Sequence, residues 1–218
     1  MAFKPQTAIR GVLSVTLINL LARLTGYGTH LAITAYIGLT DRLDAYYVAM
    51  TVLSIFIFAF GDAFAFLGIP RLVRTLREEG EEAFRLFAGS ILSFALLLSA
   101  GLCLLLLAIA PWTTVIAPGF TAEKKEYVIR NLIYLAPMAI LYLPYHAVGS
   151  FLRSKRRFKD FYLGELIIAS VALIAILAGK DFPYIIPVAF STAYLVVFLY
   201  ILRVGFREFR FSVDLRSD

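Results

Sequence analysis

Charged residues are scarce in this chain of 218 residues. Asp, Glu, Lys and Arg make up 17% of it, whereas hydrophobic residues make up 61% and the mean hydropathy is +0.82. Soluble domains contain about 25% charged and about 45–50% apolar residues, so this composition excludes a soluble globule. It favours a bundle of transmembrane helices, each of which needs about 20 mainly apolar residues.

Cysteine and histidine are almost absent as well. Cys103 is the only cysteine, which excludes a disulfide framework, and the two histidines, His30 and His146, do not form a recognisable metal-ligand motif. The sequence also lacks a glycine-rich phosphate loop, a nucleophile elbow and a histidine–carboxylate set at ligand spacing. We therefore expect no catalytic residues, no metal and no cofactor, and we expect the protein not to be an enzyme.

What the chain does contain is six long stretches with almost no charge. They cover about residues 11–38, 45–70, 86–110, 131–152, 161–179 and 182–202, and each can cross an apolar layer of about 30 Å as a helix. We predict an all-α polytopic membrane protein in which residues 1–218 form a single lobe of six transmembrane helices. Gly26 and Gly28 are expected to bend the first helix.

Basic residues are unevenly divided between alternate connections of this bundle. Fifteen Lys and Arg residues lie in the two terminal segments and in the second and fourth connections, and five lie in the other three connections. The positive-inside rule therefore predicts that both termini are cytoplasmic. The net charge of +6 indicates membrane topology and contact with anionic lipids, and we expect no nucleic-acid partner.

Two charged residues interrupt the first and second spans. A charge at membrane depth costs about 2.5–3.5 kcal/mol on the insertion scale, so such residues usually face a bundle interior or a watery cavity. Arg23 and Asp62 lie at similar depth, and we expect them to pair in a cavity wall. Arg23, Tyr27, His30 and Thr34 share one helix face, which predicts a hydrophilic path for a polar or anionic substrate. The alternative is a polar network between helices that binds no ligand.

Three further polar residues lie near predicted helix ends. Asp44 is expected to cap the second helix, and Thr121 to cap the helix that contains the fourth span. Glu165, near the start of the fifth span, is expected to lie at the membrane interface close to Arg157 and Lys159.

Several short segments follow one another in a recognisable order. They are Ala22–Tyr27, Asp44–Ala49, Ala63–Pro70, Ala117–Phe120, Gly149–Phe158 and Phe209–Arg216. In sequence and spacing they resemble the MurJ (MviN) family of lipid II flippases, within the multidrug/oligosaccharidyl-lipid/polysaccharide exporter superfamily. The resemblance covers nearly the whole chain.

This resemblance implies the amino-terminal lobe of a transporter that has two six-helix lobes around a cationic cavity. Such flippases alternate between inward-open and outward-open states in the bacterial inner membrane. Their substrate is lipid II, an undecaprenyl-pyrophosphate-linked sugar used in peptidoglycan biosynthesis, and membrane lipids surround them. The second lobe is expected either to be missing from this chain or to be supplied by a homodimer.

The chain departs from the family in three helices. The family has an arginine and an aspartate in the first helix, a cavity arginine in the second, and a proline and an asparagine in the fifth. These positions hold Thr29 and His30, Phe56 or Ile57, and Glu165 and Ala169. The departures leave two alternatives open: an exporter of polysaccharide repeats or drugs from the same superfamily, or a membrane scaffold that does not transport.

Together, the residue pattern and the resemblance predict a substrate path. Its expected members are Arg23, Tyr27, Thr29, His30, Thr34, Asp44 and Asp62. Arg23 is expected to contact the phosphates of the head group, because a planar guanidinium can bind phosphate oxygens with two parallel hydrogen bonds.

Overall fold

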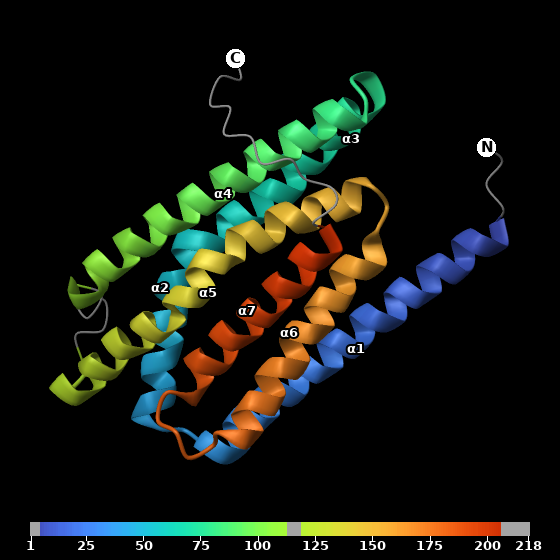
Figure 1. Ribbon diagram of the computed structural model, residues 1–218. Helices are drawn as coiled ribbons and strands as arrows, with labels where there is room; N and C mark the ends of the chain where they lie inside the picture. Colours follow the sequence, from blue (N-terminus) through green and yellow to red (C-terminus); the bar gives the residue numbers. More distant parts are fainter. Residues whose placement is uncertain (1–4, 113–118, 206–218) are drawn as a thin grey trace.

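A computed structural model describes residues 5–112 and 119–205 of the chain (Figure 1). These residues form helices and turns with no strand, which confirms the all-α prediction for the described part. The elements are α1 (Pro5–Ile37), α2 (Asp41–Ala63), the π-helical turn η1 (Phe64–Gly68), α3 (Ile69–Glu78), α4 (Glu81–Ile109), α5 (Ala122–Ser154), α6 (Phe158–Ala178) and α7 (Ile185–Gly205).

Five helical segments among the described residues are long and apolar enough to cross a membrane. They are Asp41–Glu78, Glu81–Trp112, Ala122–Ser154, Phe158–Ala178 and Ile185–Gly205. The predicted first span, residues 11–38, coincides with the 33-residue helix α1 but is not among the five. Asn19, Arg23 and His30 lower the mean hydropathy of α1.

Several helices extend well beyond the predicted spans. The second span was expected to end at Pro70, but the helical segment continues to Glu78; α5 begins at Ala122, as its predicted Thr121 cap requires, well before the expected start of the span at Asn131. The reason is that charged residues mark where a segment leaves an apolar layer, and they do not interrupt backbone hydrogen bonding. Helix ends are therefore set by caps and turns.

The helices pack around α5, which contacts α2, α4 and α7. Its side chains are buried on most sides, including Leu132, Leu135, Leu143 and Tyr145 at 0% exposure. Helix α1 packs against α6, and α1 and α4 form opposite edges of the bundle (Figure 1). The outer faces of these two edge helices carry exposed leucines, as expected of surfaces that face lipid: Leu13, Leu17, Leu24, Leu97 and Leu104.

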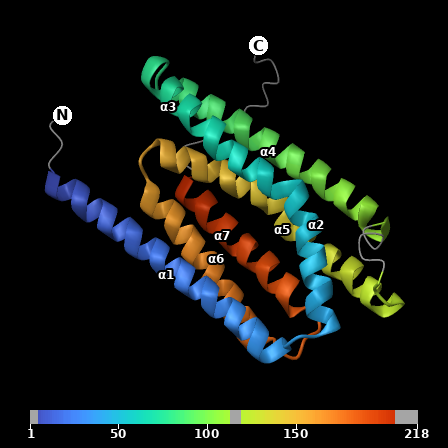
Figure 2. The same ribbon diagram turned by 180° about the vertical axis from the view of Figure 1, so that it is seen from behind.

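Helices α1 and α2 diverge from the short turn that joins them. Figure 2 shows α5, α6 and α7 lying between them, and α1 packs on α6 whereas α2 packs on α5. Gly38 makes the turn possible because its φ of 67° lies in the left-handed region that glycine occupies without strain. The first two helices therefore lie apart and pack on different partners.

The bend expected in α1 is found in the next helix. Gly26 and Gly28 keep helical backbone angles within an uninterrupted helix, and α1 runs straight in both views (Figures 1 and 2). The path from α2 to α3 bends instead, where the helix widens into the π-helical turn Phe64–Gly68. A π-turn inserts an extra residue into the hydrogen-bond ladder, which changes the helix direction. The expectation of a bend at the two glycines was therefore wrong.

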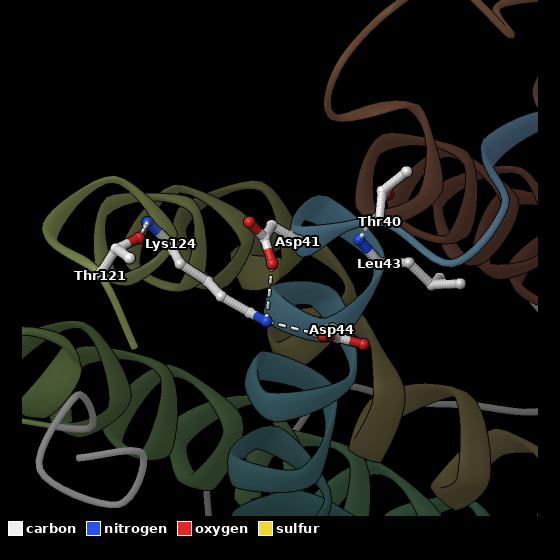
Figure 3. Close-up of polar contacts among 6 residues, drawn as sticks. All are labelled: Thr40, Asp41, Leu43, Asp44, Thr121 and Lys124. Carbon is white, nitrogen blue, oxygen red and sulfur yellow. Dashed lines mark hydrogen bonds and ion pairs between the residues drawn. The ribbon is translucent and has the colours of Figure 1, made fainter. Parts of the chain in front are cut away.

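Of the two predicted helix caps, one is confirmed and the other is wrong (Figure 3). The Thr121 hydroxyl accepts a hydrogen bond from the Lys124 backbone N–H at 3.3 Å, which confirms this cap of α5. Asp44 does not cap α2, because Thr40 occupies the N-cap position and accepts from the Leu43 N–H at 3.4 Å. The side chain of Asp44 is therefore available for another contact.

Candidate functional site

A cavity of about 320 Å³ lies between α1, α6 and α7. Phe190 contributes the α7 wall, and its ring stacks on Tyr46 of α2 with 6.4 Å between centroids. The cavity therefore lies on the side of the bundle where α1 and α2 diverge. Its polar lining residues are Asn19, Arg23, Thr29, His30 and Glu165. We call it the α1–α6 cavity.

Only two of the four residues that were predicted to form a polar stripe on one face of α1 line this cavity. Arg23 and His30 are exposed and line it, whereas Tyr27 and Thr34 are exposed but do not. The four residues share one face of α1, and α6 packs against the neighbouring face. Tyr27 and Thr34 point further from α6 and therefore lie outside the cavity. The Thr34 hydroxyl donates to the His30 carbonyl at 3.0 Å, a contact within the helix.

Thr29 connects α1 to α6. Its side chain is 2% exposed, and its hydroxyl makes hydrogen bonds to the carbonyls of Thr25 at 3.0 Å and Ala169 at 3.4 Å. Thr29 borders the α1–α6 cavity, but its donor is already used between the two helices. A small hydroxyl at this position allows close packing of α1 on α6.

Glu165 lines the cavity. From the sequence it was expected at the membrane interface instead. Its Oε1 accepts a hydrogen bond from the Tyr145 hydroxyl at 2.7 Å, and the Tyr145 side chain is fully buried. Arg23 and Glu165 thus bring opposite charges into one cavity from α1 and α6. No local pattern indicates the Tyr145 partner, because it lies on a different helix.

Asn19, one helical turn before Arg23, also lines the cavity and was not predicted from the sequence, although its i, i+4 spacing from Arg23 identifies it.

Asp62 lies apart from Arg23. It is exposed on α2 immediately before the π-helical turn, and no ion pair of the described residues joins it to Arg23. Similar depth along two consecutive helices suggested that they would meet. They do not meet in this conformation, because α1 and α2 diverge and pack on different partners.

Aromatic residues of α2, α5 and α7 form a cluster that sequence analysis did not identify. The Tyr142 ring lies 4.9 Å from Phe58, 4.4 Å from His146 and 5.6 Å from Tyr194, measured between centroids. A Cβ atom on Gly61 would lie 2.5 Å from Cε1 of Tyr142, so α2 approaches α5 closely here. The spacing of Tyr142 and His146, one turn apart on α5, is the signal that could have indicated this cluster.

Asp44 lies at the other end of α2 and holds that helix to α5. The Lys124 ammonium donates to Oδ2 of Asp44 at 2.7 Å and to Oδ1 of Asp41 at 2.9 Å (Figure 3). The Lys124 side chain is 13% exposed, and its Nζ also lies 4.3 Å from the ring centroid of Phe120. In this structure Asp44 is thus part of a contact between helix ends, away from the α1–α6 cavity.

Replacing Lys124 with methionine is expected to weaken this contact but not the fold. Methionine keeps the packing on Phe120 and removes both ion pairs, whose carboxylates are largely exposed. Exposed ion pairs contribute little, so we expect a decrease in melting temperature of about 1–2 °C in detergent that disappears at high salt. The Asp44→Asn variant should show a smaller decrease, because Lys124 keeps its pair with Asp41, and the double variant should melt no lower than Lys124→Met alone. Additive decreases would contradict the pairing.

Parts of the resembling segments lie outside the described residues. These are Phe209–Arg216 and residues 117–118 of the Ala117–Phe120 turn. The side chain of Phe56, one candidate for the position of the family's second-helix arginine, is not described either. Ile57, the other candidate for the position of the family's second-helix arginine, is 1% exposed and belongs to the hydrophobic core.

Comparison with known proteins supports the fold. No family model matches the sequence. Among solved structures, the chain is similar to one described as lipid II flippase MurJ in an inward closed conformation, with a TM-score of 0.70 and 17% identity. The match covers 94% of this chain and 44% of that one, so this chain spans less than half of the flippase's length. At this identity the likeness shows a shared fold, and with the five apolar helices it indicates a membrane protein.

Proposed function

We propose that this chain is one lobe of a transporter that moves a lipid-linked cell-wall precursor across the bacterial inner membrane. The observation that carries the proposal is a polar cavity containing Arg23, in a lobe with a flippase-like fold. The substrate proposed first is lipid II, which would place the protein in peptidoglycan biosynthesis. The transport cycle would be alternating access between this lobe and a second one, from a longer chain or a second copy.

The cavity chemistry supports a phosphate-linked sugar as ligand. The Arg23 guanidinium can donate two hydrogen bonds to phosphate oxygens, and Asn19 and His30 on the same helix can bond sugar hydroxyls. Glu165 adds an acceptor on the opposite wall and balances the charge of Arg23 when no substrate is bound. The lipid tail can remain in the bilayer while only the head group enters the polar path.

A second candidate is an exporter of lipid-linked polysaccharide repeats from the same superfamily. It is favoured by the charge of the cavity, because Arg23 is the single cation among its described lining residues and Glu165 offsets it. A ligand with more sugar and less phosphate would suit such a lining. Competition of unlabelled lipid-linked polysaccharide with labelled lipid II distinguishes the two candidates.

We further propose that both termini are cytoplasmic. Basic residues concentrate at the end of the bundle that carries the α3–α4 and α5–α6 turns, where α1 also begins (Figure 1). We call this the basic end; its residues include Arg77, Arg85, Lys155, Arg156 and Lys159. The positive-inside rule places such an end in the cytoplasm.

The test of the proposed function is transport by the protein in proteoliposomes. Fluorescent lipid II should move between leaflets faster than in protein-free vesicles, and expression should rescue cells depleted of their lipid II flippase. The chain is to be tested as a homodimer and joined to any second lobe encoded after it. The proposal is wrong if neither form transports lipid II or a lipid-linked polysaccharide. A membrane scaffold that does not transport then becomes the better interpretation.

Access of water to the α1–α6 cavity provides an independent prediction. A cysteine replacing His30 should react with a membrane-impermeant thiol reagent, and lipid-linked substrate should slow the reaction. A cysteine replacing Leu104, which is 69% exposed on the outer face of α4, should not react because lipid covers it. The unaltered protein sets the background, since Cys103 is 3% exposed. Equal labelling of the two variants would contradict a watery cavity beside α1.

A further inference from the structure

A second cavity, of about 460 Å³, lies at the basic end and is separate from the α1–α6 cavity. Helix α3, the end of α5 and the start of α6 enclose it. Its lining combines four cationic residues, Arg77, Arg153, Lys155 and Arg156, with four apolar ones, Ile69, Val73, Leu76 and Phe158, and with Ser154. None of the described residues that line it carries a carboxylate.

Arg153 gives the cavity a positioned cation. Its Nε donates to the Gly149 carbonyl at 3.1 Å, and its guanidinium lies 4.2 Å from the ring centroid of Phe161. These contacts fix the plane of the guanidinium while it remains partly exposed. Among the described residues it has no carboxylate within ion-pair distance, unlike Lys155, which pairs with Glu81 and lies over Phe84. A held guanidinium without a carboxylate favours an anionic ligand.

Arg156 stands where a helix end usually has glycine. Its φ is 60°, in the left-handed region, and it is the only described non-glycine residue with a positive φ. The Arg157 N–H bonds to the Leu152 carbonyl at 2.8 Å and the Arg156 N–H to that of Arg153 at 3.0 Å, which closes α5 as a Schellman motif. Glycine would adopt this backbone with less strain. A strained arginine that lines a cavity points to a function for its side chain.

The apolar lining residues identify the kind of anion. Ile69, Val73 and Leu76 recur on one face of α3 at helical spacing, and Phe158 is 42% exposed beside them. A soluble phosphate would leave this surface uncovered, whereas a phospholipid would cover it with its glycerol and upper acyl chains. The cavity also lies at the ends of apolar helices, at the level where lipid head groups are found.

We propose that this cavity binds the phosphate head group of an anionic phospholipid, held by Arg77, Arg153 and Arg156 and covered by the apolar face of α3. The site is distinct from the transport path and does not depend on the proposed function. A bound lipid would fasten α3 to the junction of α5 and α6.

The test measures binding of phosphatidylglycerol to the purified full chain in detergent, by native mass spectrometry and by the shift in melting temperature. Arg156→Gly is the informative variant, because it removes the charge while relieving the backbone. We expect it to stay folded in detergent without lipid, and to bind phosphatidylglycerol about tenfold more weakly. Arg77→Ala should weaken binding by a similar factor, since that side chain is exposed and is not part of the core.

Arg74→Ala is the matched control, because this arginine lies on the same helix, is exposed and pairs with Glu78 outside the cavity. It should leave lipid binding unchanged; a loss equal to that of Arg77→Ala would show diffuse surface attraction and overturn the site. Phosphatidylcholine and glycerol 3-phosphate serve as further probes. Equal binding of phosphatidylcholine would overturn the selectivity for anionic lipid. Binding of glycerol 3-phosphate as tight as that of phosphatidylglycerol would show that the ligand is a soluble phosphate.

Discussion

Replacing Arg23 with alanine is expected to lower the rate of lipid II transport in proteoliposomes at least tenfold. Arg23 is the single cation among the described residues that line the α1–α6 cavity. A hydrogen bond to a charged group contributes about 1.5–3 kcal/mol, and each 1.4 kcal/mol corresponds to a factor of ten. Arg23→Lys should retain part of the activity, because lysine keeps the charge but loses the planar pair of donors.

The same change should leave the fold intact. Arg23 is exposed and belongs to none of the ion pairs found among the described residues, so its loss leaves no buried partner without a contact. The melting temperature should stay within about 2 °C of the unaltered protein, as expected for a surface substitution. Arg74→Ala, on α3 outside the cavity, is the matched control and should transport normally. Undiminished transport by Arg23→Ala would remove the head-group role assigned to this residue.

Replacing Gly149 with valine is expected to give the largest loss of stability. A Cβ atom at Gly149 would lie 2.5 Å from Cε2 of Phe161, and the Phe161 ring is 5% exposed between Tyr145 and Arg153. The ring cannot move aside without disturbing both neighbours. Overpacking of this kind costs about 1–3 kcal/mol, so the melting temperature in detergent should fall by about 2–12 °C.

Gly101 provides the control for this change. It lies within α4, where an added Cβ atom meets nothing within 4 Å, so Gly101→Ala should not lower the melting temperature. Shortening the opposing ring with Phe161→Leu should recover part of the stability of a Gly149→Ala variant, because it removes the atoms that clash. A Gly149→Val protein as stable as the unaltered one would show that α5 and α6 do not pack this closely.

The helices were predictable because their signal is local. A run of about 20 apolar residues identifies a membrane helix whatever lies elsewhere in the chain. The sequence also indicated the Thr121 cap, and it placed Arg23 and His30 on one face of α1, where they line a cavity. Helix ends were less accurate, because charges mark the edge of an apolar layer and not the end of a helix.

The site was only partly predictable, because its contacts join residues far apart in the chain. The Thr29 hydroxyl contacts the carbonyl of Ala169, 140 positions away. Glu165 was assigned to the membrane interface because its partner Tyr145 could not be recognised from spacing along one helix. Asp62 was paired with Arg23 on depth alone, and depth does not say which helices are neighbours.

What the sequence alone determined is that this is an all-helical chain with several apolar spans and a polar stripe on its first helix. The small number of charged residues in each segment allowed this conclusion, because insertion into an apolar layer depends on the composition of that segment by itself. The tertiary structure alone decided which of the few charged groups lie together. Packing α1 on α6 and α2 on α5 brought Glu165 into the cavity with Arg23, and it left Asp62 outside.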